Sequence, residues 1–307
     1  MNLLETRMAY QTGQLNKPEF IDAMHVLHTR LFEYSEYLHD TDIASIEITD
    51  AQVLITSRST GIRMICDKSN KRAAPIEILN FGSYEKDYSN MMLRLSEPNF
   101  CIFDIGANIG WYTLLIAKTF RAAKVHAFEP LPETYNTLVK NIEINHALNV
   151  CLHNFGFWDS AGKIIFYFPA GGSDNASAAN LSGRDDVYCF ECQVRTIDDF
   201  VSENTLNVDL IKCDVEGAEL LVLKGGIRTI RLHKPILFAE MLRKWSAKFN
   251  YHPNEIITLL NKFGYHCYTV RGNCLQEFDR MTDSTLDTNF CFLHREKHAL
   301  QISSLVL

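Results

Sequence analysis

One stretch of the chain decides the fold: Phe103-Asp104-Ile105-Gly106-Ala107-Asn108-Ile109-Gly110-Trp111. An apolar run, 101–105, leads into its two glycines, and a helical pattern, 111–120, follows them. Glycines at such a strand-to-helix turn let the backbone approach a ligand closely, and the free N–H groups at a helix start face a polar or anionic group. The stretch therefore predicts a ligand-binding turn between a buried strand and a helix.

The next apolar run, 124–128, ends at a second candidate ligand-binding residue, Glu129. A carboxylate at this strand tip can accept hydrogen bonds from both hydroxyls of a ribose. Asn108 stands where a pyrophosphate-binding G-x-G-x-x-G turn has its second glycine, and the carboxylate of Asp104 would repel a pyrophosphate while suiting an amine. S-adenosylmethionine has an amine, a sulfonium and a ribose but no phosphate, so these residues favour it over NAD.

Around this unit the chain alternates apolar runs with amphipathic helical patterns from residue 100 onward, which is typical of a parallel sheet covered on both faces. The 307 residues are enough for one large α/β domain with an appendage. We expect a helical and hairpin cap over 1–99, with a helix at 16–39 and a hairpin at 46–65, and a catalytic domain over 100–307. The predicted strands are 101–105, 124–128, 150–155, 164–168, 209–213, 235–240, 265–270 and 289–294, and the predicted helices of the domain are 111–120, 132–146, 216–224 and 253–263.

Composition excludes several classes of partner. Lys plus Arg is 30 and Asp plus Glu is 37, and the net charge of −7 argues against nucleic acid and anionic membrane surfaces as partners. No run of about 18 apolar residues predicts a membrane span, and the first residues lack the layout of a signal peptide. Nine cysteines scattered through apolar runs suit reduced thiols in a cytoplasmic protein, and the C-x-x-C of Cys189 and Cys192 falls in a strand pattern that points the two thiols to opposite sides.

Three carboxylates are candidates for the chemistry. Asp214 and Glu216 follow the apolar run 209–213, and Glu240 closes the run 235–240, at the strand ends where α/β sheets bind ligands. They could act as a general base, or Asp214 and Glu240 could hold a divalent cation such as Mg²⁺. Their non-catalytic interpretations are a helix start for Glu216 and a surface strand end for Glu240. The sequence leaves these alternatives open.

The ordered motifs resemble those of the FkbM-type S-adenosylmethionine-dependent methyltransferases over residues 83–272. The motifs are Asp104-Ile105-Gly106-Ala107-Asn108-Ile109-Gly110, Phe128-Glu129-Pro130, Thr196-Ile197-Asp198-Asp199-Phe200 and Ile211-Lys212-Cys213-Asp214-Val215-Glu216-Gly217-Ala218-Glu219. The resemblance implies a Rossmann-like seven-stranded methyltransferase fold with a mostly parallel sheet. It also implies which residues contact the cofactor. The methionine end would be contacted by Asp104, Gly106, Asn108, Gly110 and Asp214, the ribose by Glu129 and Pro130, and the adenine by Gly156 and Phe157. Tyr84 and Glu85 would approach the cofactor from the N-terminal side.

The expected activity is O-methyl transfer from S-adenosylmethionine to a hydroxyl of a small molecule that is sugar-like or polyketide-like. The sequence leaves open whether the protein forms a homodimer. The polar loop 170–177 is either a neighbour of the acceptor or a plain surface loop. His126 is expected in the core, and His153 is expected in the core or at its edge, with a position facing the site as the alternative. Two alternatives remain: an NAD-dependent oxidoreductase or sugar epimerase on the same strand–helix–strand unit, and a non-catalytic scaffold with a methyltransferase fold.

Overall fold

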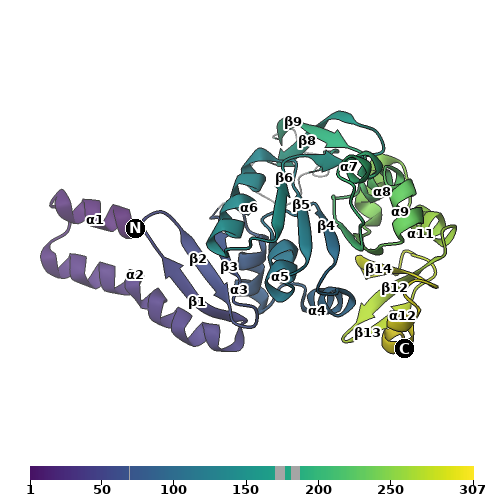
Figure 1. Cartoon of the computed structure of the whole chain (residues 1–307). Helices are drawn as coiled ribbons and strands as arrows, with labels where there is room; N and C mark the ends of the chain where they lie inside the picture. The colour runs from purple at the N-terminus through teal and green to yellow at the C-terminus, as the bar shows by residue number, and fades with distance from the viewer. Residues whose placement is uncertain (69, 170–176, 181–186) are drawn as a thin grey trace.

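The main sheet of the computed structural model, which describes residues 1–68, 70–169, 177–180 and 187–307, has eight strands in the order β13-β12-β14-β11-β10-β4-β5-β6 (Figure 1). Strands β6, β5, β4, β10 and β11 are parallel, whereas β14 is antiparallel to both β11 and β12. The predicted mostly parallel α/β sheet is therefore confirmed, and β13 extends seven strands by a short hairpin with β12. Its strands are β4 (Cys101–Ile105), β5 (Lys124–Phe128), β6 (Val150–His153), β10 (Leu210–Cys213), β11 (Ile236–Glu240), β12 (Tyr265–Arg271), β13 (Cys274–Glu277) and β14 (Asn289–His294).

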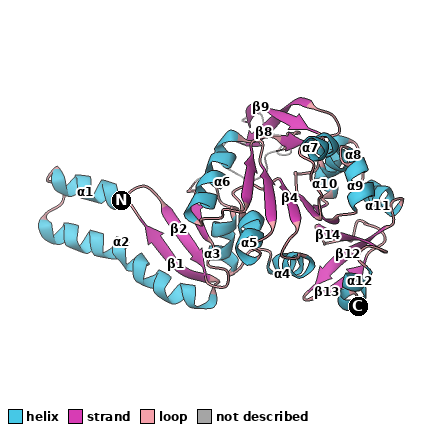
Figure 2. Cartoon of the chain, in the orientation of Figure 1, coloured by secondary structure: helices cyan, strands magenta, loops and turns pink. Residues whose placement is uncertain are grey.

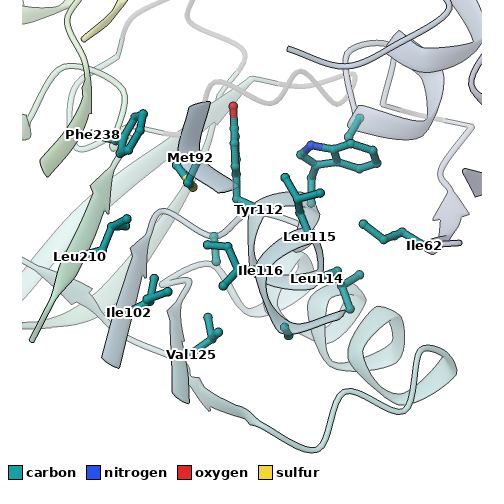
Figure 3. Packing of buried hydrophobic residues seen from close by; sticks show 14 of the residues in the cluster. Ile62, Met92, Ile102, Tyr112, Leu114, Leu115, Ile116, Val125, Leu210 and Phe238 are labelled. Atoms are coloured by element: carbon teal, nitrogen blue, oxygen red, sulfur yellow. The ribbon is translucent and has the colours of Figure 1, made fainter. Parts of the chain in front are cut away.

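Helices pack on both faces of this sheet (Figure 2). One apolar cluster joins the sheet to α3, α4, α5, α6 and α12, and the other joins it to α7, α8, α9 and α11. Figure 3 shows the first cluster, where Ile116 of α5 points toward Ile102 and Val125 of two neighbouring strands. The helices are α3 (Ala74–Phe81), α4 (Lys86–Leu95), α5 (Trp111–Thr119), α6 (Pro132–Ile144), α7 (Ile197–Glu203), α8 (Glu219–Lys224), α9 (Ile227–His233), α10 (Arg243–Ser246), the 3₁₀ turn η2 (Ala247–Phe249), α11 (Asn254–Asn261) and α12 (Ala299–Leu305).

A second, three-stranded sheet has the order β7-β9-β8, formed by β7 (Gly156–Phe157), β8 (Gly162–Pro169) and β9 (Val187–Arg195). The predicted strand 164–168 therefore exists as part of β8, but it lies outside the main sheet, because it pairs antiparallel with β9 along its whole length. In β9, Cys189 is exposed and Cys192 is buried, as the alternation of a strand requires. All nine cysteines of the chain are free thiols.

The N-terminal residues form the predicted helix and hairpin, together with a further helix, a 3₁₀ turn and a further strand. Helices α1 (Leu3–Gln11) and α2 (Lys17–Tyr37) precede the 3₁₀ turn η1 (Leu38–Asp40), and the hairpin gains a third strand. The three antiparallel strands are β1 (Ile43–Ile48), β2 (Val53–Ser57) and β3 (Arg63–Cys66). None of the helices in the described part of the chain is long and apolar enough to cross a membrane.

Two asparagines attach β3 to the main domain, Asn141 in α6 and Asn145 directly after it. Asn145 accepts a hydrogen bond from the Arg63 N–H (2.9 Å) and donates one to the Arg63 carbonyl (2.6 Å). Asn141, fully buried, accepts from the Ile65 N–H (3.0 Å) and donates to the carbonyl of Ile109 in the glycine-containing turn (2.8 Å). The amides thus satisfy backbone groups on one edge of β3 and tie this strand to the turn that the sequence predicts to bind a ligand.

Candidate functional site

A cavity of about 400 Å³ opens at the carboxyl ends of β4, β5, β10 and β11. Its position is the switch point of the sheet, because β4 pairs with β5 on one side and with β10 on the other. Of the predicted site residues, the cavity is lined by Tyr84, Glu85, Gly106, Asn108, Glu129, Pro130, Asp214, Glu216 and Glu240. The topology therefore brings most of the predicted site to one place.

Close backbone packing fixes the glycine-containing turn between β4 and α5. Gly106 has φ of +75°, and a Cβ there would lie 1.8 Å from the carbonyl oxygen of Asp214. Gly110 has φ of +97°, and its Cβ would lie 2.6 Å from a methyl of Leu138. Side chains are excluded at both positions, so the turn can pass directly over the end of β10.

Glu129 is held by the backbone on either side of it. One carboxylate oxygen accepts the N–H of Asn108 (3.1 Å) and the other accepts the N–H of Leu131 (3.0 Å). Burial raises the pKa of Glu129 to about 7, although these two hydrogen bonds act in the opposite direction. Each carboxylate oxygen has a second lone pair, so the group retains the capacity to accept from a ligand hydroxyl.

Lys212 of β10 is a buried cation under the turn, and the sequence interpretation missed it. Its Nζ lies 3.5 Å from Oδ1 of Asp104 and 3.2 Å from Oδ2 of Asp214, and it donates to the carbonyl of Gly106 (3.2 Å). Burial by itself lowers the pKa of Lys212, but Asp214, Asp104 and Glu85 more than offset this effect and raise it above its usual value. Asp104 lies beneath the cavity wall, where its other oxygen accepts from Thr113 (2.6 Å).

Glu85 enters the cavity from the start of α4 with a left-handed backbone (φ +40°). It accepts hydrogen bonds from the hydroxyl of Tyr112 (2.5 Å) and from the side-chain amide of Asn289 (3.2 Å). Burial, as the largest cause, raises its pKa. Tyr84 also lines the cavity and packs edge-on against Trp111, with ring centroids 5.7 Å apart.

Three carboxylates converge at the far end of the cavity. Oxygen atoms of Asp214, Glu216 and Glu240 all lie within 4.8 Å of one another. Burial raises the pKa of Glu240 to about 11, and the nearby charges, that of Asp214 first, act in the same direction. This cluster has the oxygen donors that a hard divalent cation prefers, and it also contains groups that can accept a proton.

The loop that carries Asp214 and Glu216 differs from the expected helix start. Glu216 (φ +56°) and Gly217 (φ +102°) are both left-handed, so α8 begins at Glu219 and not at Glu216. One carboxylate oxygen of the buried Glu219 accepts the N–H groups of Val215 (3.1 Å) and Gly217 (3.0 Å). Glu219 is therefore a positioning residue for this loop.

Two further contacts hold the same loop. The Tyr251 hydroxyl donates to the Gly217 carbonyl (2.8 Å), and the Ser177 hydroxyl donates to the Glu216 carbonyl (2.9 Å). Ser177 is fully buried and follows residues 170–176 of the predicted polar loop, which lie outside the described residues.

The remaining predicted residues lie beside the cavity and not in its wall. Phe157 is buried among aromatic rings that include Phe103 and Phe200, and Gly156 lies beside Pro130, whose Cβ would be 3.5 Å from a Cβ at position 156. His126 of β5 is buried. Its Nδ1 lies 3.0 Å from Nε2 of His153 in the neighbouring strand β6, and the two rings are stacked. His126 therefore belongs to the packed interior, whereas His153 is half-buried on the edge strand β6.

The strand order, the tight turn after β4 and the carboxylate after β5 define the class of S-adenosylmethionine-dependent methyltransferases. The family model described as "Methyltransferase FkbM domain" matches residues 104–267, more than half of the chain, and the chain belongs to this family. Membership in a methyltransferase family excludes the dehydrogenase and epimerase alternatives. The family implies S-adenosylmethionine as cofactor, and the acidic cavity with Glu129 in its wall fits a ligand that has an amine, a sulfonium and ribose hydroxyls.

Three curated relatives are similar over part of their length. "Methyltransferase 1" of Beauveria bassiana is 30% identical over 142 residues, which cover 40% of this chain and 57% of the relative. "Hexuronic acid methyltransferase AglP" of Haloferax volcanii is 28% identical (46% and 56% covered), and "2-O-methyltransferase NoeI" of Sinorhizobium fredii is 29% identical (47% and 65% covered). The chain thus spans less than two thirds of the length of each of these relatives.

Proposed function

We propose that the chain transfers a methyl group from S-adenosylmethionine to a hydroxyl oxygen of a small, sugar-like acceptor. The observation that carries the proposal is the cluster of Asp214, Glu216 and Glu240, whose oxygens lie within 4.8 Å of one another in the cavity that also contains Glu129. One end of the cavity would thereby hold the cofactor and the other would activate the acceptor.

The cofactor end consists of the turn and the two strand tips beside it. S-adenosylmethionine, when bound, supplies an electrophilic methyl group on its sulfonium. Gly106, Asn108 and Gly110 would lie along its methionine end, with Asp104 and Lys212 supporting the turn from below. Glu129 would accept the ribose hydroxyls, and Tyr84 and Glu85 would close the cavity from the N-terminal side. Gly156 and Phe157 would lie beside the adenine end, near Pro130 in the cavity wall.

The acceptor end supports an aliphatic hydroxyl as the nucleophile. Such a hydroxyl is a weak acid, so its attack on a methyl group is helped by a general base or by a bound cation. The carboxylate cluster offers both routes. In the first, one of its oxygens would accept the hydroxyl proton. In the second, Asp214 and Glu240, together with Glu216, would hold a divalent cation such as Mg²⁺, which would lower the pKa of the hydroxyl. Glu240 carries a proton at neutral pH without a cation, since its pKa is raised to about 11.

Two observations favour a sugar-like acceptor over an apolar natural product. The described wall of the cavity beyond the cofactor residues is rich in polar groups, which include Asp67, Asn70, Arg72 and Thr137. Two of the similar proteins are named for a hexuronic acid and for 2-O-methyl transfer.

Calorimetry with S-adenosylhomocysteine and with NADH tests the cofactor first. We expect heat with S-adenosylhomocysteine and none with NADH, and no binding of S-adenosylhomocysteine would favour the scaffold alternative. Glu129→Ala should weaken S-adenosylhomocysteine binding at least about tenfold, since each hydrogen bond to a charged group contributes about 1.5–3 kcal/mol. Unchanged affinity would refute the ribose role of Glu129.

A screen of sugars, glycoconjugates and polyketides with an isotopically labelled methyl donor then tests the acceptor. Asp214→Asn should reduce turnover by about 100-fold or more, in the range of general acid–base contributions, whereas Asp199→Asn, at an exposed position on α7, should leave it unchanged. Repeating the screen with EDTA distinguishes the routes: loss of activity that Mg²⁺ restores supports the cation, and full activity supports the base. Labelling of amines or phenols but of no aliphatic hydroxyl would overturn the proposal.

A further inference from the structure

The connection from β3 to α3 borders the candidate site. Of its described residues, Asp67, Asn70, Arg72 and Ala73 line the cavity. They precede the segment 104–267 that matches the family model. The N-terminal part of the chain therefore supplies one part of the cavity wall.

Both ends of this connection are anchored beside the turn between β4 and α5. At its start, Asn141 joins Ile65 of β3 to Ile109 of the turn, because its side-chain amide accepts from the N–H of the first (3.0 Å) and donates to the carbonyl of the second (2.8 Å). At its end, Ala73 is buried in the same apolar cluster as Ala107 of the turn. In this region β3 packs against both α3 and α6 (Figure 1). The connection is thereby held next to the turn that the methionine end of the cofactor would contact.

Arg72 is an unpaired cation in this part of the wall. Asn70 positions its backbone, since the side-chain oxygen of Asn70 accepts the N–H groups of Arg72 and Ala73 (3.0 Å each). The guanidinium of Arg72 forms no ion pair and no hydrogen bond with any residue that the structure describes. A guanidinium stays charged in proteins, and its planar donors fit a carboxylate in a bidentate pair. Arg72 is therefore available to bind an anion.

The other charges of the cavity wall cannot take this role. Among the described residues that line the cavity, eight are acidic and two are basic, Arg72 and Lys212. The three donors of the Lys212 ammonium are matched by an oxygen of Asp104, an oxygen of Asp214 and the carbonyl of Gly106. An anion in this acidic cavity therefore has Arg72 as the one described cation that can compensate its charge.

The cofactor carries such an anion. The methionine end of S-adenosylmethionine has an ammonium group and a carboxylate, both ionised at neutral pH. Carboxylates of the wall, among them Glu85 and Asp214, suit the ammonium and the sulfonium. None of the residues that the sequence predicts for this end is a cation. The carboxylate of the cofactor therefore still needs a positive partner.

We propose that Arg72 binds the methionine carboxylate of S-adenosylmethionine, so that the N-terminal part of the chain completes the cofactor site. The inference rests on the cofactor of the proposed function and is independent of the acceptor. Arg72 then belongs to the cofactor end of the cavity, and Asp67, Asn70 and Thr137 remain as the polar groups that favour a sugar-like acceptor.

Calorimetry with two ligands that differ only in this carboxylate tests the proposal. S-adenosylhomocysteine has the carboxylate, whereas its decarboxylated analogue, S-adenosyl-3-thiopropylamine, keeps the amine and lacks it. We expect the wild type to bind S-adenosylhomocysteine at least about tenfold more tightly than the analogue, because bidentate pairs of ions are among the stronger hydrogen-bonded contacts. Arg72→Ala should weaken the binding of S-adenosylhomocysteine at least about tenfold. It should leave the affinity for the analogue within about threefold of the wild-type value, since exposed charges act weakly at a distance.

Two further variants separate the shape and the place of the guanidinium from its charge. Arg72→Lys keeps the charge without the planar donors, so it should retain an intermediate preference for S-adenosylhomocysteine. Lys71→Ala is the matched control, because it removes an exposed charge one position earlier, outside the described cavity wall. This control should keep the full preference.

Three results would overturn the proposal and leave the cofactor in place. The first is a wild type with equal affinities for the two ligands. The second is an Arg72→Ala variant that keeps the preference, which would assign the carboxylate to backbone N–H groups at the start of α5. The third is an Arg72→Ala variant that loses affinity for both ligands alike. A wild type that binds neither ligand would overturn the cofactor itself, and this proposal with it.

Discussion

Lys212→Met is expected to destabilise the protein strongly, because it removes a buried charge and keeps most of the side-chain volume. In the wild type Nζ lies 3.5 Å from an oxygen of the fully buried Asp104 and 3.2 Å from an oxygen of the partly exposed Asp214. At an effective dielectric constant of about 20 each contact is worth roughly 5 kcal/mol before desolvation is counted. Removing one partner of a buried ion pair costs about 3–5 kcal/mol net, because the other charge stays buried and uncompensated.

Urea unfolding, followed by circular dichroism, measures this loss. In thermal unfolding, a loss of 3–5 kcal/mol corresponds to a decrease in Tm of roughly 5–8 °C for a chain of 307 residues. Lys224→Met, at an exposed position on α8, is the matched control and should change the free energy of unfolding by less than about 0.5 kcal/mol.

The double variant Lys212→Met/Asp104→Asn isolates the charge effect. Asparagine keeps an oxygen for the Thr113 hydroxyl but carries no charge, so the double variant should be at least about 1 kcal/mol more stable than Lys212→Met alone. The reasoning is refuted if Lys212→Met costs less than about 1 kcal/mol, or if Asp104→Asn adds a further loss on top of it.

Three other substitutions test the supports of the site. Gly106→Ala should abolish S-adenosylhomocysteine binding in calorimetry, because its Cβ would lie 1.8 Å from the Asp214 carbonyl oxygen. Asn141→Leu should lower the free energy of unfolding by about 2–4 kcal/mol in urea, since it leaves backbone groups of β3 and of the turn unpaired. Burial lowers the pKa of His126 to about 4, whereas the pKa of an unfolded histidine is about 6.5. As the pH falls from 6.5 to 4, the unfolded chain therefore takes up a proton before the folded chain does, and the free energy of unfolding decreases. His126→Phe should remove about 2 kcal/mol of the stability that the wild type loses between pH 7 and pH 5.

Matched controls accompany these substitutions. Gly162→Ala, with nothing within 4 Å of its Cβ, should bind S-adenosylhomocysteine normally. Exposed Asn207→Leu should not reproduce the loss seen at position 141, and exposed His39→Phe should not change the pH dependence. A Gly106→Ala variant that binds the ligand, an Asn141→Leu variant of normal stability, or equal pH slopes with and without the imidazole would each contradict the corresponding argument.

The parts of the site that sequence predicts are those that local rules determine. Gly106 and Gly110 are required by the backbone of one turn, and Glu129 follows directly from the end of the next strand. Asp214 and Glu240 are distant in sequence, but both lie at the ends of strands of a parallel sheet, and the carboxyl ends of neighbouring parallel strands meet at one edge. The topology alone thus brings these two carboxylates together.

The parts that sequence did not predict depend on contacts between distant residues. Glu219 and Tyr251 fix the loop after β10 from positions 32 residues apart, and no periodicity relates them. Lys212 did carry a signal: a lysine inside an apolar strand, two residues before an aspartate, must be paired when it is buried. The predicted strand 164–168 is confirmed as part of β8, but its partner β9 could not be predicted, because a run of apolar residues indicates burial and does not identify the neighbouring strand. The helix start at Glu216 was wrong because a left-handed glutamate is rare and no propensity predicts it.

Charge is distributed unevenly among the acidic groups of the cavity. Beneath the turn, one cation, Lys212, contacts both Asp104 and Asp214, and Asp214 also belongs to the carboxylate cluster. Glu240 lies among the other carboxylates of the cluster, where burial first, and then their negative charge, raises its pKa to about 11. Excess negative charge of this kind is relieved by a proton or by a bound cation. On the proposed function, Asp214, Glu216 and Glu240 decide how the hydroxyl proton of the acceptor is removed. A chelator should lower turnover if they hold a cation and leave it unchanged if one of them is the base. In both cases the affinity for S-adenosylhomocysteine should stay the same.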